Sequence, residues 1–180
     1  MTDMIDFTNL ASIAGKITDN EGWKNKHGFT EGRDGLESLI GKICVFYERA
    51  GDEAITLIFS DGTALRMQHH QDCCETVEIE DLNGDLADLL YTPLLVAEER
   101  TNESGSEETG CSQTWTFYTL RTIKGSIDIR WLGQSNGYYS ESVNLDIGVP
   151  KEPLSHHAQM ALIEDSKSYR SAYDNDGKEL

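Results

Sequence analysis

Alternating apolar and polar side chains over residues 64–82 constrain the fold of this chain more than any other feature. Leu65 and Met67 alternate with polar residues in the first half of this stretch, and Val77 and Ile79 do so in the second. A side-chain period of two is typical of β-strands that bury one face. The pattern therefore predicts two strands joined by a short polar turn that is rich in His, Cys and acidic residues.

Similar strand patterns recur along the middle of the chain, separated by short segments that contain Gly or Asp. Because most of these connections have the length of a hairpin and helical patterns are few, neighbouring strands are expected to pair antiparallel. The sequence predicts an α+β fold: a mainly antiparallel β-sheet of about eight strands with one short helix after the fourth strand. The strands are expected at residues 43–49, 54–60, 64–70, 75–81, 94–100, 115–122, 126–133 and 142–147, and the helix at residues 84–90, starting at Asn83 or Asp85.

The two ends of the chain differ in composition from this middle part. Residues 1–35 are polar and rich in glycine, and residues 149–180 are polar. We therefore expect a β-rich core domain at residues 36–148 between an N-terminal and a C-terminal extension. Further expectations are a short helix at residues 7–17, a helical turn at 36–40, a mobile acidic loop at 101–112, a helix at 154–165 and a disordered or partner-ordered tail at 166–180.

Bulk properties narrow the class of protein. The 180 residues contain no apolar run near the roughly 20 residues of a membrane helix, and the N-terminus lacks the basic region of a signal peptide, so we expect a cytoplasmic protein. The four cysteines match neither a disulfide framework nor a CxxC zinc motif. Adjacent Cys73 and Cys74 could form only a strained bridge, so reduced thiols are expected.

Charge is concentrated in one part of the sequence. The formal net charge is −17, and residues 67–120 hold 12 Asp and Glu against one Arg. This disfavours direct binding of nucleic acid, which needs a basic face, but permits an acidic surface that occupies a basic groove on a host protein, as a nucleic-acid mimic would. A simpler interpretation is that the acids only keep the protein soluble. The predicted partner-binding residues are Asp72, Glu75, Glu78, Glu80, Asp85, Asp88, Glu99, Glu103, Glu107 and Glu108.

Several short motifs in the middle of the chain resemble those of one protein family. They are HQDCCE at residues 70–75, IEDLNGDL at 79–86, TWTFY at 114–118, IKG at 123–125 and RWLGQSNGYYS at 130–140. Over roughly residues 40–146 the chain resembles a small family of uncharacterised proteins carried by bacteriophages and bacteria, a domain of unknown function. The resemblance implies a phage origin, and it implies no particular reaction or catalytic residues.

The turn at residues 69–75 is the densest cluster of reactive groups. As an alternative to a purely structural turn, His70, Asp72, Cys73 and Cys74 could hold a metal such as zinc, although adjacent residues of a strand point to opposite faces. Cys74 could also be a nucleophile with His69 or His70 as its base, but no third catalytic group is recognisable. In the structural interpretation Cys73 packs as a small apolar residue while the polar groups hydrogen-bond the turn. We predict no catalytic residue and no cofactor.

The loop at residues 131–141 has the composition of a binding loop. Its glycines permit tight turns and its tyrosines offer rings with hydrogen-bonding tips, which suit a nucleobase-sized ligand or a protein partner. No phosphate-binding glycine motif is present, and the tyrosines could instead cap the core. The alternative ligand-binding residues are Trp115, Arg130, Asn136, Tyr138, Tyr139 and Glu141.

The function expected from these observations is that of a phage-encoded, non-enzymatic inhibitor. It would bind a host protein with a basic surface, such as a component of anti-phage defence. One alternative is a protein that binds or sequesters a signalling nucleotide, and another is a metal-dependent enzyme built on the His-Cys turn.

Overall fold

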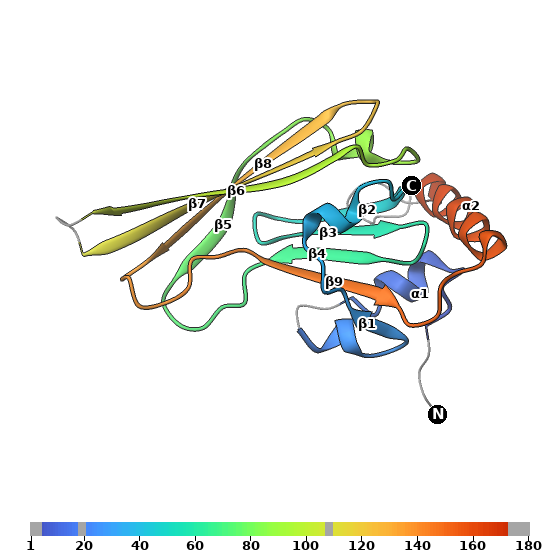
Figure 1. The fold of residues 1–180 in the computed structure, drawn as a ribbon, viewed down its shortest axis with the longest axis horizontal. Coiled ribbons are helices and arrows are strands. Elements are labelled where there is room, and N and C mark those ends of the chain that lie inside the picture. Colours follow the sequence, from blue (N-terminus) through green and yellow to red (C-terminus); the bar gives the residue numbers. More distant parts are fainter. Residues whose placement is uncertain (1–4, 18–20, 107–109, 173–180) are drawn as a thin grey trace.

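A computed structural model describes residues 5–17, 21–106 and 110–172 of the chain. The strands of this part form two antiparallel sheets (Figure 1). The five-stranded sheet has the order β1 (Phe29–Glu31), β9 (Asn144–Pro150), β4 (Ala64–Gln68), β3 (Ala54–Phe59) and β2 (Cys44–Ala50). The four-stranded sheet has the order β5 (Thr76–Asn83), β8 (Ser126–Ser135), β7 (Cys111–Arg121) and β6 (Val96–Ser106).

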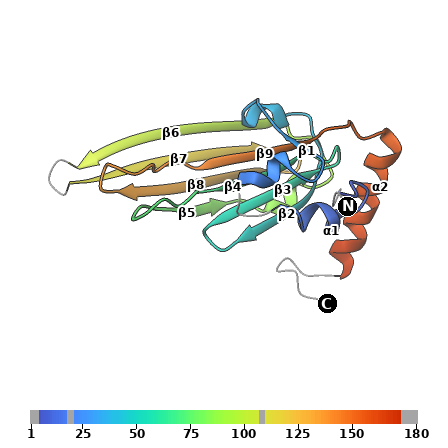
Figure 2. The same cartoon turned by 90° about the horizontal axis from the view of Figure 1, so that it is seen from below.

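The main hydrophobic core lies between the two sheets. Leu57 and Leu65 of the five-stranded sheet belong to the same buried cluster as Ile129 and Trp131 of β8 and Tyr118 of β7. Burying one face of each sheet against the other is the usual way in which antiparallel sheets form a stable core. The four-stranded sheet is therefore anchored through one face, and its strands run on past the end of the five-stranded sheet (Figures 1 and 2).

Helices and the terminal segments cover the other face of the five-stranded sheet. A second buried cluster joins Leu10 of α1 (Leu10–Ala14), Trp23 of the 3-10 helix η1 (Glu21–Asn25) and Leu162 of α2 (His156–Ala172) to Val45 and Ile58 of the sheet. Because β3 is covered on both sides, all six of its residues are buried. The segments expected as extensions thus contribute to the packing, and β1 pairs with β9.

The sequence correctly predicts a mainly antiparallel β protein with few helices, but it differs from the structure in the number of sheets and strands. The described residues form nine strands in two sheets, where about eight strands in one sheet were expected. The two strands predicted within residues 64–82 are present as β4 and β5, yet they belong to different sheets. Period-two alternation shows that a strand has one buried face, and it does not show which strand pairs with it.

Two further expectations need correction. The predicted helix at residues 84–90 is a single 3-10 turn, η3 (Leu86–Leu89), whose cap is Asp85, while Asn83 ends β5. Residues 101–106 and 111–112, expected in a mobile loop, extend β6 and β7 as paired strands, and residues 107–109 lie outside the described residues. The helical turn at η2 (Leu36–Leu39) is confirmed, and α2 continues through Ala172, into the predicted tail. Within the described residues, no helix combines the length and the apolar composition needed to cross a bilayer.

Candidate functional site

The four-stranded sheet presents one face to solvent, which we call the outer face. Ile127, Ile129 and Trp131 of β8 are buried in the core, so the residues between them point the other way. Every described side chain on the outer face is exposed or half-buried. The register of the strands arranges these side chains in rows across the sheet: Asn83, Asp128, Thr119 and Glu98 in the first, Asp81, Arg130, Phe117 and Arg100 in the second, and Glu78, Leu132, Trp115 and Asn102 in the third.

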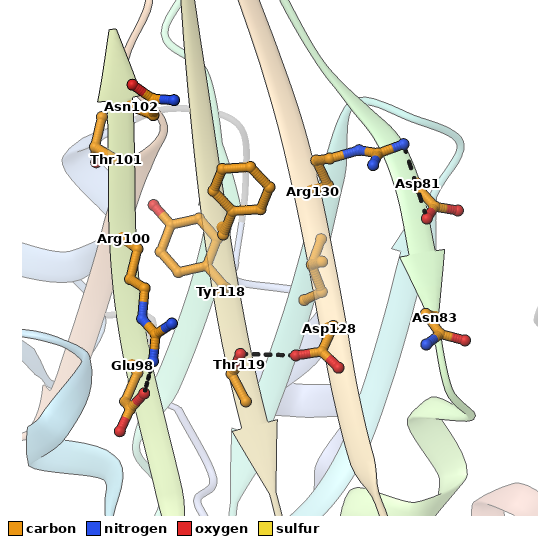
Figure 3. A pocket seen from close by; sticks show the side chains of 12 residues that line it. Asp81, Asn83, Glu98, Arg100, Thr101, Asn102, Tyr118, Thr119, Asp128 and Arg130 are labelled. Carbon is orange, nitrogen blue, oxygen red and sulfur yellow. Dashed lines mark hydrogen bonds and ion pairs between the residues drawn. The ribbon is translucent and has the colours of Figure 1, made fainter.

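A hollow of about 580 Å³ lies on the outer face (Figure 3). The first two rows of side chains line it, and so do parts of Thr101, Asn102, Tyr118 and Ile129. Its lining mixes aromatic, cationic, anionic and amide groups, which come from all four strands of the sheet. Since these strands are hydrogen-bonded to one another along their length, the groups are held on a rigid scaffold.

Two aromatic residues of the central strand β7, Trp115 and Phe117, form the apolar centre of the outer face. The guanidinium of Arg130 lies 5.6 Å from the centre of the Trp115 ring, close enough for a cation–π interaction. Arg130 Nε also donates a hydrogen bond of 2.7 Å to Glu80, which lies at the bulge of β5, between Ile79 and Asp81. The ring and the ion pair with Glu80 together fix the orientation of this arginine, whose guanidinium also lies 4.0 Å from the carboxylate of Asp81.

The remaining charged groups of the hollow form weaker local pairs. Arg100 donates a hydrogen bond of 3.1 Å to Glu98 on the same strand, and the Thr119 hydroxyl donates one of 2.7 Å to Asp128. Arg100 and Glu98 are both exposed, and an exposed ion pair contributes only about 0–1 kcal/mol. These side chains can therefore exchange their present partners for those of a docking molecule at little cost.

The turn between β4 and β5 is organised around a buried carboxylate, Glu75. It accepts hydrogen bonds from the backbone N–H groups of Asp72 (2.5 Å) and Cys73 (3.0 Å), and one oxygen lies 3.1 Å from Nε2 of His69. These contacts, above all the one from the Asp72 backbone, outweigh burial and lower the pKa of Glu75 to about 2. Glu75 is thus an internal anchor of the turn, and its predicted place on a partner-binding surface is wrong.

The alternative metal site is not assembled in this turn. Nε2 of His70 lies 2.9 Å from the carboxylate of Asp146 on β9, whereas Cys73 and Cys74 are both exposed at the surface of the turn. Among the described residues, no three His, Cys, Asp or Glu side chains are grouped as metal ligands. The expectation that Cys73 packs as an apolar residue is also wrong, because the turn carries both cysteines outside the strand.

A second buried carboxylate, Glu141, lies on the opposite face of the four-stranded sheet. It accepts hydrogen bonds from the hydroxyls of Ser112, Ser135 (2.6 Å) and Thr114 (2.7 Å). Burial opposes ionisation of this group, but the three hydroxyl donors outweigh it and lower the pKa of Glu141. Glu141 ties the segment before β9 to β7 and β8, which is a structural role.

The acidic residues predicted to bind a partner do not share one surface. Of the described members, Glu78 and Glu80 belong to the outer face, while Glu75 is buried and Glu99 pairs across the sheet with Tyr118, on the opposite face. Successive strand residues point to opposite faces, so an acidic sequence does not produce an acidic face. The others are Asp72 in the turn, Asp85 and Asp88 at η3, and Glu103, Glu107 and Glu108, whose side chains lie outside the described residues.

The alternative ligand-binding residues are likewise divided. Trp115 and Arg130 lie together on the outer face, but Glu141 is buried on the other side of the sheet. Asn136 accepts a hydrogen bond from the backbone of Tyr138, which is 84% exposed at the turn. Tyr139 packs edge to face on Tyr138, and its phenol is hydrogen-bonded to the side chain of Cys73, which raises the pKa of the phenol to about 12. These residues are therefore divided between the outer face, the opposite face of the sheet and the turn after β8.

Sequence reasoning missed most of the residues that line the hollow. The predicted binding residues did not include Phe117, Arg100, Asp128, Asp81, Asn83, Glu98 or Thr119. A usable signal exists: in residues 126–132 the buried residues alternate with Asp128 and Arg130, so these two must share the face opposite the core. The same alternation in β7 puts Trp115, Phe117 and Thr119 on one face.

The fold and the outer face define a two-layer antiparallel β protein whose smaller sheet is anchored on one side and open on the other. Residues 37–145 match the family model described as Domain of unknown function (DUF7448). This match covers more than half of the chain, so the chain belongs to this family. No curated protein and no solved structure matches the chain.

Proposed function

We propose that the protein is a non-enzymatic binding protein that docks onto another protein through the outer face of its four-stranded sheet. The observation that carries this proposal is that Trp115 and Phe117 lie beside the positioned Arg130 on an open, rigid surface. Aromatic residues and arginine are the side chains enriched at protein interfaces and at their energetic hot spots.

The charge of the molecule supports a partner with a basic surface. The net charge is −17, and carboxylates surround the aromatic centre, including Asp81, Glu98 and Asp128. Such a field speeds association with a cationic surface and disfavours an anionic one. Because arginines are interspersed with these acids, recognition rests on a mixed pattern of charges more than on an array of carboxylates resembling a phosphate backbone.

The biological setting that we propose is inhibition of a host protein, such as a component of anti-phage defence, by a phage-encoded protein in the host cytoplasm. The resemblance of its motifs to those of proteins carried by bacteriophages supports this setting. An inhibitor needs only a binding surface, and the open outer face of this small acidic domain is one.

The proposal can be tested by capturing a partner from host lysate with the wild-type protein and comparing its binding with that of two variants. Trp115→Ala should weaken binding about 30-fold, since truncating a hot-spot aromatic costs about 2 kcal/mol or more. Tyr138→Ala is the control, because Tyr138 is an aromatic residue that is 84% exposed in the turn after β8, off the outer face. Binding should also fall as salt is raised from about 0.1 M to about 1 M, because screening shortens the range of charge attraction. Equal binding by both variants would refute this docking face.

A small-molecule function is the second candidate, favoured by the volume of the hollow. About 580 Å³ is within the usual range for ligand sites, roughly 300–1,000 Å³, and Arg100 and Arg130 lie on either side of Phe117 in one row. A signalling nucleotide that stacks on this ring and pairs with these arginines should raise the melting temperature in a thermal-shift screen. Loss of that shift in Phe117→Ala would place the ligand in the hollow.

A further inference from the structure

The two adjacent cysteines of the turn between β4 and β5 are arranged as a pair. Cys73 and Cys74 are both exposed, and their Sγ atoms lie 2.7 Å apart. Adjacent residues in a regular strand would point to opposite faces, so this contact is a product of the turn. This pair of thiols belongs neither to a metal site nor to the outer face.

Hydrogen bonds hold the backbone that carries the two thiols. The carboxylate of Glu75 accepts hydrogen bonds from the backbone N–H groups of Asp72 and Cys73. The side-chain amide of Gln71 donates to the backbone carbonyl oxygens of Cys73 (3.3 Å) and Glu75 (2.7 Å). The turn is also tied to the start of β9, because the N–H of His70 donates to the side-chain oxygen of Asn144 (2.9 Å). The entropy of bringing the sulfurs together is thus largely lost on folding, which favours a reaction between them.

We propose that Cys73 and Cys74 form a reversible oxidation site that closes to a disulfide between neighbouring residues by exchange with a low-molecular-weight disulfide such as oxidised glutathione. In the first step one cysteine thiolate attacks a sulfur of that disulfide, and one molecule of reduced glutathione leaves. In the second step the other cysteine thiolate attacks the protein sulfur of the mixed disulfide and expels a second glutathione. The protein loses two protons and two electrons in total, and the small disulfide gains them as it becomes two molecules of reduced glutathione.

The geometry of adjacent residues makes this bond easy to reverse. Cα atoms across a trans peptide bond are about 3.8 Å apart, whereas ordinary disulfides span about 4.4–6.8 Å. Strained and exposed disulfides are the labile ones, in contrast to buried structural bridges. Cys44 is excluded as a competing partner because it is buried in the core, which leaves Cys111 as the other exposed thiol among the described residues.

Mass spectrometry of the full-length protein tests the site directly. Reduced protein is equilibrated with mixtures of oxidised and reduced glutathione, unfolded in an alkylating agent and digested with trypsin. The peptide of residues 67–100 contains Cys73 and Cys74 and no other cysteine. In excess oxidised glutathione it should change from doubly alkylated to unalkylated, with a mass two hydrogens below that of the peptide with two free thiols. Dithiothreitol should reverse the change.

Cys74→Ser is the control variant, since it cannot close the bond and should carry glutathione on Cys73 instead. Cys111→Ser should behave like the wild type. The proposal is overturned if the wild-type peptide retains a glutathione adduct, if it is cross-linked to the peptide that contains Cys111, or if both cysteines remain alkylated at every ratio. Because binding at the outer face is measured separately, this result is independent of the proposed function.

Discussion

Removing the buried carboxylate of Glu141 should destabilise the protein by an amount that the structure bounds. Hydrogen bonds to charged groups contribute about 1.5–3 kcal/mol each, and Glu141 accepts three from hydroxyl groups. A neighbouring cavity of about 210 Å³, which Thr114 and Glu141 both line, lets water reach the Thr114 hydroxyl after a substitution, so the net loss is smaller than the sum. We expect Glu141→Ala to lower the free energy of unfolding by about 3 kcal/mol, and Glu141→Gln, which keeps the shape and one acceptor oxygen, by about 1–2 kcal/mol.

Urea unfolding followed by tryptophan fluorescence measures these changes, because Trp131 lies fully buried in the core. For a chain of this size, a loss of about 3 kcal/mol corresponds to a melting temperature lower by about 6–12 °C. Glu98→Ala is the control, since Glu98 is an exposed carboxylate and should change stability by no more than about 0.5 kcal/mol. A Glu141→Ala protein as stable as this control would refute the assigned anchoring role.

The carboxylate of Glu141 should also make the stability of the protein fall in acid. The folded-state pKa of Glu141 is lowered from its ordinary value of 4.5, so its ionised form contributes stability above that pH. This contribution is lost as the pH falls below 4.5 toward the folded-state pKa. Glu141→Gln lacks the titrating group, so its stability should decline less steeply than that of the wild type in acid. Identical slopes for the two proteins would show that the carboxylate is not preferentially ionised in the folded state.

Three further predictions follow from other parts of the fold. Because hydrogen bonds lower the pKa of Glu75 to about 2, its stabilising effect should be lost between pH 4.5 and 2, so Glu75→Gln should flatten the melting temperature across this range while Glu78→Gln should not. In urea unfolding, Gly84→Ala should lower stability more than Gly51→Ala. Gly84 has φ +105°, and a Cβ there would lie 2.4 Å from the backbone carbonyl oxygen of Ser126, whereas a Cβ on Gly51 meets nothing within 4 Å. Burial raises the pKa of the Cys44 thiol to about 12, so native protein should be alkylated at its exposed cysteines and not at Cys44.

The sequence allowed the strands of the middle region to be predicted because their alternation is local. Residues 54–60 and 126–133, for example, coincide with β3 and β8 to within a residue or two. The division into two sheets could not be predicted, because the alternation in β4 and β5 is the same whether these two strands pair with each other or with other strands. The strand extensions at residues 101–106 and 111–112 were missed because composition alone indicates a loop, whereas polar residues form a strand when a neighbouring strand supplies pairing, as β6 and β7 do for each other.

The candidate site was predictable only in part. Trp115 and Arg130 were identified from their chemistry, but the acids were grouped by their closeness in sequence. In a sheet, the rows that bring Asp128, Thr119 and Glu98 together run across strands that are distant in the chain. The register that creates these rows depends on the bulge in β5 and on hairpin geometry, neither of which the sequence pattern specifies.

The most direct test of the central claim is site-specific photo-cross-linking from the outer face. A photoreactive amino acid at position 117 replaces a ring that is 39% exposed in the hollow, and the same group at position 138 serves as a reference elsewhere on the surface. In host lysate, position 117 should give a cross-link to one protein, weakened by Trp115→Ala and by high salt, and position 138 should give none to that protein. Cross-linking to it from position 138 alone would contradict the account.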